Sequence, residues 1–451
     1  MIRGMNAPYR TTDDRGLEPL TARRRLLLAV MVLVVAAESV LQVTALRTRE
    51  PIDFTARYAG GWLLDQGRSP YDRAELSAVE RALWPGLAEL PFWDPPPTAA
   101  AFRFISRLPL HEAALAWTLL SVICLAAIGW LLADLLGVRP WTTRLTIVGL
   151  LMLFGPARSS LLLGQIEAVS LLPLFAAIWL CLRRPHAGPP TALCAALAVV
   201  ALCKPQLAYL PVAVVLVHCY RRDRLAAAVG AAAAALALVV LARLAAPSAH
   251  WSDWLATLRD RPEGPAWWVR LALLTGGVAG IAFALRAAAS CRDSFEGRLL
   301  LAAGCNGLGA AVVLWNPQWH VVLILPVLAL LALGDPSARS RWDQAVLVGL
   351  AAICLPDTIA GYTYYVGLAY AVVPLCLSAV ILVAVVWARL VPPAWAAATW
   401  LLAAVLLIPP VEPWFAQAKG LVLCLAVLWL LPLVGGGWTR QRTAEAGSRL
   451  L

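Results

Sequence analysis

Residues 26–46 read LLLAVMVLVVAAESVLQVTAL, and residues 51–58, a few positions further on, read PIDFTARY. The first stretch is apolar and is long enough to cross a hydrocarbon core of roughly 30 Å as a helix. Arg23, Arg24 and Arg25 precede it, which places its start in the cytoplasm. The second stretch sets a carboxylate, an arginine and aromatic rings just outside the bilayer. Together they predict a membrane span followed by an outer loop that carries reactive groups.

The composition of the whole chain is that of a polytopic membrane protein. Hydrophobic residues make up 61% of its 451 residues and charged residues only 14%, against about 25% charged residues in soluble domains. The net charge of +11 reflects arginines that cluster in alternate short loops, as the positive-inside rule predicts. No aromatic stacking face accompanies these clusters, which argues against nucleic-acid binding. We therefore predict an all-α integral membrane protein with about 12 to 14 transmembrane helices.

We expect one membrane-embedded domain at residues 26–434, flanked by cytoplasmic tails at residues 1–25 and 435–451. The loop at residues 47–110 is expected to be extracytoplasmic and ordered, because its tryptophans and tyrosines suit a structure lying on the membrane. The protein should thus be a multi-pass protein of the cell membrane with both termini in the cytoplasm. Helices are predicted in the loop at 55–64 and 73–83, and spans follow it at 112–136 and, further on, at 225–246.

Two later pairs of apolar segments are interrupted, the first at Gly155-Pro156-Ala157-Arg158 and the second at Lys204-Pro205. Both breaks fall opposite the arginine-rich loops, so both should face the same outer side as the long loop. Broken helices are tolerated at membrane depth mainly where they line a cavity.

The cysteines predict neither disulfides nor a metal site. They lie in or at the ends of apolar runs, and no CxxC pair occurs. We expect them to be small apolar fillers, and we expect no metal and no cofactor. The ten positions are Cys124, Cys181, Cys194, Cys203, Cys219, Cys291, Cys305, Cys354, Cys376 and Cys424.

Asp53 is the first candidate for chemistry, because it follows the first span and lies near the outer membrane surface. It suits a general base for a hydroxyl, and it equally suits the N-cap of the helix that follows. Asp65, Asp72 and Asp94 share the loop, and the last two fit a helix cap or a turn as well.

Three cationic side chains are candidates to bind a phosphate on the same side. Lys204 lies in an apolar run, where an ionisable group suggests function; snorkelling to the interface is the alternative. Arg158 presents the same two alternatives. His320, next to Trp319, either contacts a phosphate or is an ordinary interfacial residue.

Gln165 and Glu167 follow the first break. Gln165 either hydrogen-bonds a sugar or joins two helices. Glu167 either lies in the site or pairs with Arg158 or Lys204. No nucleotide-phosphate loop, Rossmann glycine pattern, HExxH or DxD is present, so any sugar donor should be lipid-borne rather than a cytosolic sugar nucleotide.

Five motifs together resemble glycosyltransferase family 87, the polyprenyl-phosphate-mannose-dependent membrane mannosyltransferases of actinobacteria. They run in the family's order across most of the first 320 residues. They are Asp53-Phe54 with Tyr58, Gly67 through Pro70-Tyr71-Asp72, the prolines before Leu108-Pro109-Leu110, Gly164-Gln165, and Lys204-Pro205, with Asn316-Pro317 to Trp319-His320 as a looser match.

The resemblance implies a GT-C fold, with many helices and a cavity open to the exterior. It implies Asp53 as base for an inverting transfer of mannose from a polyprenyl phosphate to an outer-face glycolipid or cell-envelope glycan. The expected roles are donor-phosphate binding by Lys204, His320 and Arg158, and sugar or acceptor binding by Tyr58, Gln165, Glu167, Tyr71, Asp72, Trp319 and Asp94. Asp94 and Glu167 depart from the family's usual aromatic and asparagine, which leaves the donor sugar and acceptor open.

Three alternatives remain. The donor sugar could be arabinose, giving a polyprenyl-phosphate-arabinose-dependent arabinofuranosyltransferase. A secondary transporter or flippase of lipid-linked sugars would also contain broken helices, although no internal repeat is visible. A structural membrane subunit without chemistry is the third. Membrane lipids are expected partners in each case.

Overall fold

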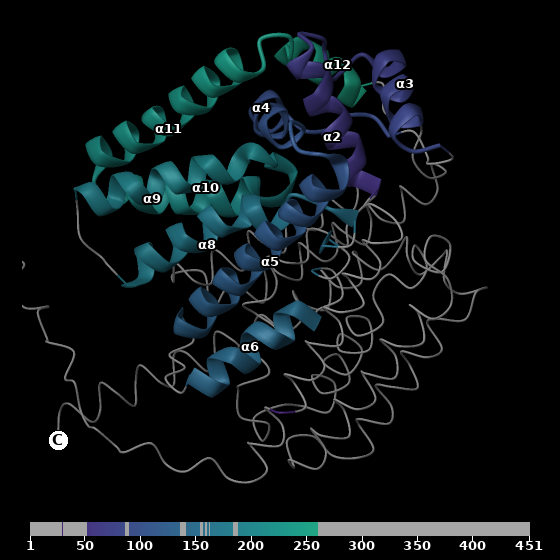
Figure 1. Ribbon diagram of the computed structural model, residues 1–451. Helices are drawn as coiled ribbons and strands as arrows, with labels where there is room; N and C mark the ends of the chain where they lie inside the picture. The colour runs from purple at the N-terminus through teal and green to yellow at the C-terminus, as the bar shows by residue number, and fades with distance from the viewer. Residues whose placement is uncertain are drawn as a thin grey trace, which may run out of the picture.

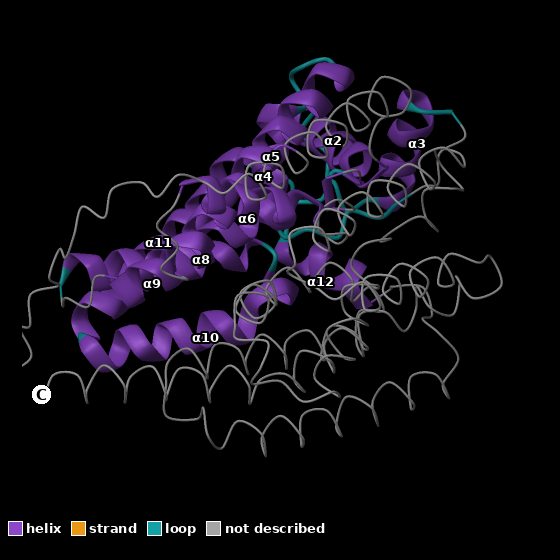
Figure 2. Ribbon diagram, turned by 90° about the horizontal axis from the view of Figure 1, so that it is seen from below, coloured by secondary structure: helices purple, strands orange, loops and turns teal. Residues whose placement is uncertain are grey.

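The computed structural model describes residues 52–85, 90–135, 141–153, 163–183 and 188–259, with isolated positions at 29, 157, 160 and 161. Every element in these ranges is a helix, as predicted, and no strand occurs among them (Figure 2). Residue 29 apart, the span expected at 26–46 lies outside the described residues, as do all spans expected after residue 259. The expected number of spans therefore stays a prediction.

Three short helices gather at one end of the longer ones (Figure 1). They are α2 (Ile52–Asp65), α3 (Arg73–Leu83) and α4 (Pro96–Ile105), and the first two are the helices predicted at 55–64 and 73–83. Asp72 caps α3, because its carboxylate accepts the amide hydrogens of Ala74 and Glu75 at 3.0 and 3.1 Å. Prolines open α4, where a missing amide hydrogen costs nothing.

Helix α2 is held tightly against α4. A Cβ atom on Gly61 would lie 2.3 Å from the carbonyl oxygen of Phe102, so only glycine allows the two backbones to approach this closely. Next to this contact, the buried ring of Phe54 lies 6.1 Å from Phe102 and 6.4 Å from Trp117, centroid to centroid. This aromatic core fixes the first turn of α2 against the rest of the molecule.

Two helices among the described residues are long and apolar enough to cross a membrane. They are α5 (Leu110–Leu135), with 26 residues, and α11 (Arg224–Ala245), with 22 residues. Both match spans predicted at 112–136 and 225–246. Leucines such as Leu119 on α5 and Leu244 on α11 are exposed, which suits helices with lipid-facing sides.

The remaining helices pack beside these two. Helix α9 contacts α8, α10 and α11, and a Cβ on Gly230 of α11 would lie 2.0 Å from the carbonyl oxygen of Ala192 on α9. The helical path is interrupted at residues 164–166, before α8, and at Lys204, before α10. The break predicted at 155–158 lies, Ala157 apart, outside the described residues. The elements are α6 (Trp141–Leu153), α8 (Glu167–Arg183), α9 (Pro189–Val200), the 3-10 turn η1 (Ala201–Cys203), α10 (Pro205–Arg222) and α12 (Trp251–Arg259).

Candidate active site

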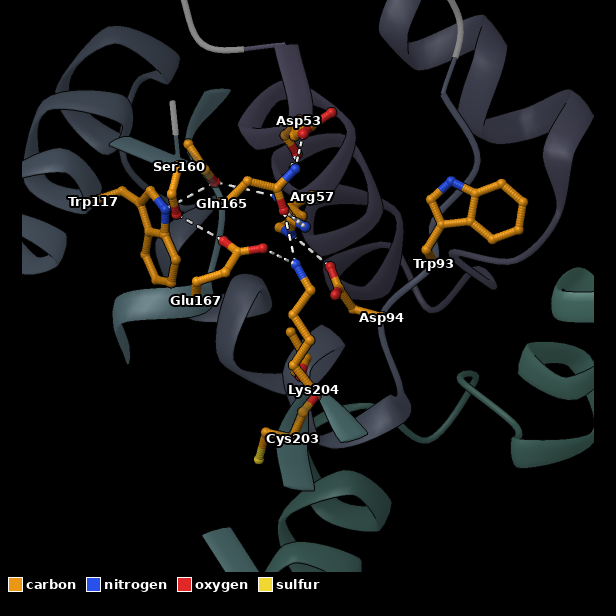
Figure 3. Close-up of polar contacts among 12 residues, drawn as sticks. Asp53, Arg57, Trp93, Asp94, Trp117, Ser160, Gln165, Glu167, Cys203 and Lys204 are labelled. Carbon is orange, nitrogen blue, oxygen red and sulfur yellow. Dashed lines mark hydrogen bonds and ion pairs between the residues drawn. The ribbon is translucent and has the colours of Figure 1, made fainter. Parts of the chain in front are cut away.

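The candidate site lies where the first turn of α2 meets the two interruptions (Figure 3). Asp53 and Arg57 are four residues apart on α2, so they lie one turn apart on the same face. Helix α2 begins at Ile52, which puts Asp53 inside the first turn. The alternative that Asp53 is the N-cap is therefore wrong. A carboxylate in this turn is stabilised by the helix dipole.

Arg57 is the centre of the site, and the residue is 7% exposed. Its Nε donates to Asp94 Oδ2 at 2.5 Å, and its Nη2 donates to Gln165 Oε1 at 3.0 Å. Its Nη1 donates to the carbonyl oxygens of Asp53 at 3.1 Å and of Gly164 at 3.2 Å. One side chain thus joins α2, the proline-rich segment and the break before α8, which the planar fork of arginine is suited to do.

The Gln165 amide links the cations of the site to Asp53. Its Oε1 accepts from Arg57 and also from Lys204 Nζ at 2.9 Å. Two donors on this oxygen fix the orientation of the amide, since a flipped amide would point its own hydrogens at two cations. The NH₂ group must then point the other way, and it donates to Asp53 Oδ2.

Lys204 forms a buried ion pair with Glu167 Oε1 and is 6% exposed. The other carboxylate oxygen of Glu167 accepts from Ser160 Oγ at 2.8 Å. Of the alternatives that the sequence left open, the structure thus pairs Glu167 with Lys204. A hydrogen bond of 3.0 Å from Thr98 Oγ1 to the carbonyl oxygen of Cys203 ties this break to α4.

The first interruption is held by its backbone. Gly164 has a φ of +68°, a left-handed conformation that favours glycine. Its carbonyl oxygen accepts from Arg57 and, at 3.1 Å, from the Trp117 indole Nε1 of α5. The turn therefore projects the Gln165 side chain toward α2 (Figure 3).

Burial raises the pKa of the Asp53 carboxyl. Loss of hydration raises its pKa from 3.8 to about 6, and the positive charges of Arg57 and Lys204 oppose this rise without cancelling it. For Arg57, burial acts to lower the pKa, but the charges of Asp94 and Asp53 outweigh it and the pKa is raised. Asp53 itself is half-buried, so part of its side chain remains accessible. A half-buried carboxyl that titrates near neutrality has the properties of a general base.

Asp94 was predicted to contact sugar or acceptor, and the structure places it beside Arg57 in the same cluster. Its Oδ1 is buried and has no hydrogen-bond partner among the described residues. A buried carboxylate oxygen in this state is costly unless something donates to it. The Asp94 backbone is also held, since its carbonyl oxygen accepts from Tyr71 Oη at 2.9 Å.

The other predicted loop residues lie at the edge of the site or away from it. The hydroxyl of Tyr58 donates to the carbonyl oxygen of Leu108 at 2.8 Å and so anchors α2 to the start of α5. Asp72 is exposed in its role as the cap of α3. Asp65 pairs with Arg103 and Arg107 at 3.3 and 3.1 Å, which lowers its pKa.

Arg158, Trp319 and His320 lie outside the described residues, so their predicted contacts with phosphate or sugar stay predictions. Conversely, sequence reasoning assigned no role to Arg57, Trp117 or Ser160. Only Arg57 gave a usable signal, because it follows Asp53 by one helical turn in a predicted helix.

These features define a helical protein with a buried acid–base centre beside long apolar helices. A profile of Glycosyltransferase family 87 matches residues 92–356, more than half of the chain. The chain belongs to this family and is a glycosyltransferase that uses a sugar donor and an acceptor; its two long apolar helices further support membrane association. No curated protein and no solved structure matches it.

The family match covers Asp94, Gln165, Glu167 and Lys204 but begins after α2. Asp53 and Arg57 are therefore tied to the family's segment by the contacts described above, in which Gln165 is the direct link.

Proposed function

We propose that this chain is an integral-membrane glycosyltransferase of GT-C type that transfers mannose from a polyprenyl phosphate to a hydroxyl of an outer-face glycolipid or glycan. Asp53 is the general base. One observation carries the assignment: a half-buried carboxyl with a pKa of about 6 is hydrogen-bonded to an amide that two cations orient. We place this site on the outer side of the cell membrane, with both termini in the cytoplasm.

The reaction proceeds as one displacement at the anomeric carbon. The acceptor oxygen attacks, its proton passes to Asp53, and the bond from the anomeric carbon to the phosphate oxygen breaks with inversion. The polyprenyl phosphate leaves with the bonding electrons. Because Gln165 occupies Asp53 Oδ2, the other oxygen, Oδ1, takes the proton. A positioned base typically increases the reaction rate by about 10²–10⁴-fold.

Lys204 and Arg57 stabilise the leaving phosphate. The ammonium of Lys204 has three hydrogens, and Gln165 and Glu167 take two of them. The third is left for a phosphate oxygen. Such charge-assisted contacts are about twice as strong as neutral ones. Arg158 and His320, with Trp319, complete the donor site in this proposal.

The sugar is held from the side of the proline-rich segment. Asp94 Oδ1 is buried and without a partner among the described residues, so a sugar hydroxyl that donates to it would satisfy it. Tyr71 positions the Asp94 backbone. Mannose is the donor in this proposal and arabinose is the alternative; both carry hydroxyls that can donate to Asp94 Oδ1.

A flippase of lipid-linked sugars is the second candidate function. The observation that favours it is the buried Lys204–Glu167 pair at a break between apolar helices, the kind of place where transporters bind ions or substrate. The Asp53 base has no role in that function.

The experiment uses the purified full-length chain in proteoliposomes with polyprenyl-phosphate-mannose and a lipid extract as acceptor. Transfer of mannose to lipid, with GDP-mannose inactive, supports the proposal. Polyprenyl-phosphate-arabinose in a parallel reaction distinguishes the two donors. Movement of the donor across the bilayer with no new glycolipid would instead assign a flippase.

A further inference from the structure

Three cysteine thiols from three different helices meet inside the described bundle. They are Cys181 on α8, Cys194 on α9 and Cys219 on α10; all three are buried, and their Sγ atoms lie within 4.8 Å of one another. The Cys181 and Cys219 sulfurs are 3.9 Å apart. The two other described cysteines, Cys124 and Cys203, do not belong to this group.

The thiol cluster lies at the opposite end of these helices from the candidate active site. Cys181 is two residues before the end of α8, and Cys219 is three residues before the end of α10. Cys194 is in the second turn of α9, which starts at Pro189. Less than two helical turns therefore separate each cysteine from the nearer helix end, which gives an ion a short route of entry.

The surroundings of this end supply positive charge and a fixed frame. Arg221 and Arg222 close α10 and are exposed. The carboxylate of Asp223 accepts the backbone amide of Gly188 at 2.9 Å and that of Ala226 at 3.0 Å. One side chain thus ties the start of α9 to the start of α11, at the same end of the helices as the thiol cluster.

The presence of three mutually close sulfurs suits a metal. A disulfide would join only two of them, about 2.05 Å apart, and Cys181 and Cys219 are not bonded at 3.9 Å. Three thiolates around one ion, each with a metal–sulfur bond of about 2.3 Å, lie roughly 4 Å from one another. Small side-chain adjustments would bring the cluster to that arrangement.

The ligand set selects the ion. Thiolates are soft ligands that favour Cu(I), zinc and iron–sulfur clusters. Structural zinc takes four protein ligands, and no fourth His, Cys, Asp or Glu joins this group among the described residues. A trigonal site of three thiolates fits Cu(I), which accepts three sulfur ligands. The cytoplasm, on which this end is predicted to open, keeps thiols reduced.

We propose that Cys181, Cys194 and Cys219 form a buried three-thiolate site for Cu(I) that fastens α8, α9 and α10 together. Each thiol that binds the ion releases its proton, and no electron is transferred. The same helices carry Gln165 and Glu167 at the start of α8 and Lys204 at the start of α10. Metal binding therefore fixes the relative positions of the elements that build the candidate active site, and this inference does not depend on the donor or the acceptor.

The test is a competition for Cu(I) between the purified, reduced full-length chain in detergent and the chromophoric chelator bicinchoninate, without oxygen. We expect one equivalent of Cu(I) to move from the chelator to the protein. Losing a residue that only supports a metal ligand typically costs 10–100-fold in metal affinity. Because Cys194 is itself a proposed ligand, Cys194→Ala should weaken Cu(I) binding by more than about tenfold. Cys124→Ala, which removes a buried thiol outside the cluster, is the matched control and should bind Cu(I) as the wild type does.

X-ray absorption on the copper-loaded wild type gives a readout that needs no variant. Three sulfur neighbours at about 2.3 Å support the site. Absence of Cu(I) transfer, transfer that Cys194→Ala and Cys219→Ala both leave unchanged, or a copper environment of nitrogen and oxygen would each overturn it.

Discussion

Replacing Gln165 by glutamate tests the geometry of the candidate site most sharply. The two side chains have the same shape, and one glutamate oxygen can keep the contacts that Gln165 Oε1 makes with Arg57 and Lys204. The second glutamate oxygen takes the place of the NH₂ group that donates to Asp53 Oδ2 in the wild type. A hydrogen-bond donor is thereby exchanged for a second carboxylate oxygen facing the first.

The expected effect is a shift in the pH dependence of the reaction. The pKa of Asp53 is about 6 in the folded protein, so the rate should rise with pH and level off above neutrality. Two carboxylates that share a site raise the pKa of one of them. With Gln165→Glu, the midpoint should move upward by about one unit or more, to roughly 7 or above, as an apparent value of the pair.

The assay is the initial rate of sugar transfer between pH 5 and pH 9 for the wild type, Gln165→Glu and Gln165→Ala. At one pH unit below the midpoint of its pH–rate profile, each enzyme should retain about one tenth of its maximal rate. The alanine variant loses the contact without adding a charge, so it controls for lost positioning. If Gln165→Glu keeps the wild-type midpoint, the proposed contact between the amide and the base is wrong.

Three further predictions concern the same cluster. The raised pKa of Asp53 means that the folded state binds its proton more tightly than the unfolded chain, so stability falls as pH rises from about 4 to about 6. Asp53→Asn should therefore increase the free energy of unfolding at pH 7.5 by about 1–3 kcal/mol, seen as a higher unfolding temperature, but should not increase it at pH 4. Equal effects at the two pH values would refute this. Arg57→Ala leaves Asp94 buried without its partner and should lower the free energy of unfolding, measured with a denaturant, by about 3–5 kcal/mol. Arg68→Ala, which breaks the exposed pair with Glu75, should lower it much less. Similar losses in the two variants would contradict the central position of Arg57. The double variant Lys204→Met with Glu167→Gln removes both charges of a buried pair, so it should fold, and it should raise the donor KM about tenfold; an unchanged donor KM would exclude Lys204 from the phosphate site.

Local sequence signals predicted much of the fold. Helices α2 and α3, the long apolar helices α5 and α11 and the break at Lys204 all follow from hydrophobic periodicity, proline positions and capping residues. These signals act within a few residues, so they can be recognised without knowledge of tertiary contacts. Sidedness deduced from the arginine-rich loops also predicted that Asp53, Gln165 and Lys204 share one side, and the structure brings them into contact.

The partners within the site could not be predicted in the same way. Arg57 meets Asp94 across 37 positions and Gln165 across 108, and nothing in the local sequence chooses among the acidic residues available to it. The same holds for Glu167, for which Arg158 and Lys204 were equal candidates. The three thiols of the cluster come from helices whose rotation about their axes is set by packing, so their meeting has no signature such as CxxC.

The most direct test of the central claim is mannose transfer by Asp53→Asn, measured beside the wild type and Asp72→Asn. Asparagine keeps the oxygen that accepts from Gln165 but cannot take a proton, whereas Asp72 is an exposed cap outside the site. We predict that Asp53→Asn folds and loses about 10²–10⁴-fold in kcat, while Asp72→Asn stays close to wild type. A folded Asp53→Asn variant with full turnover would contradict the assignment of Asp53 as the base.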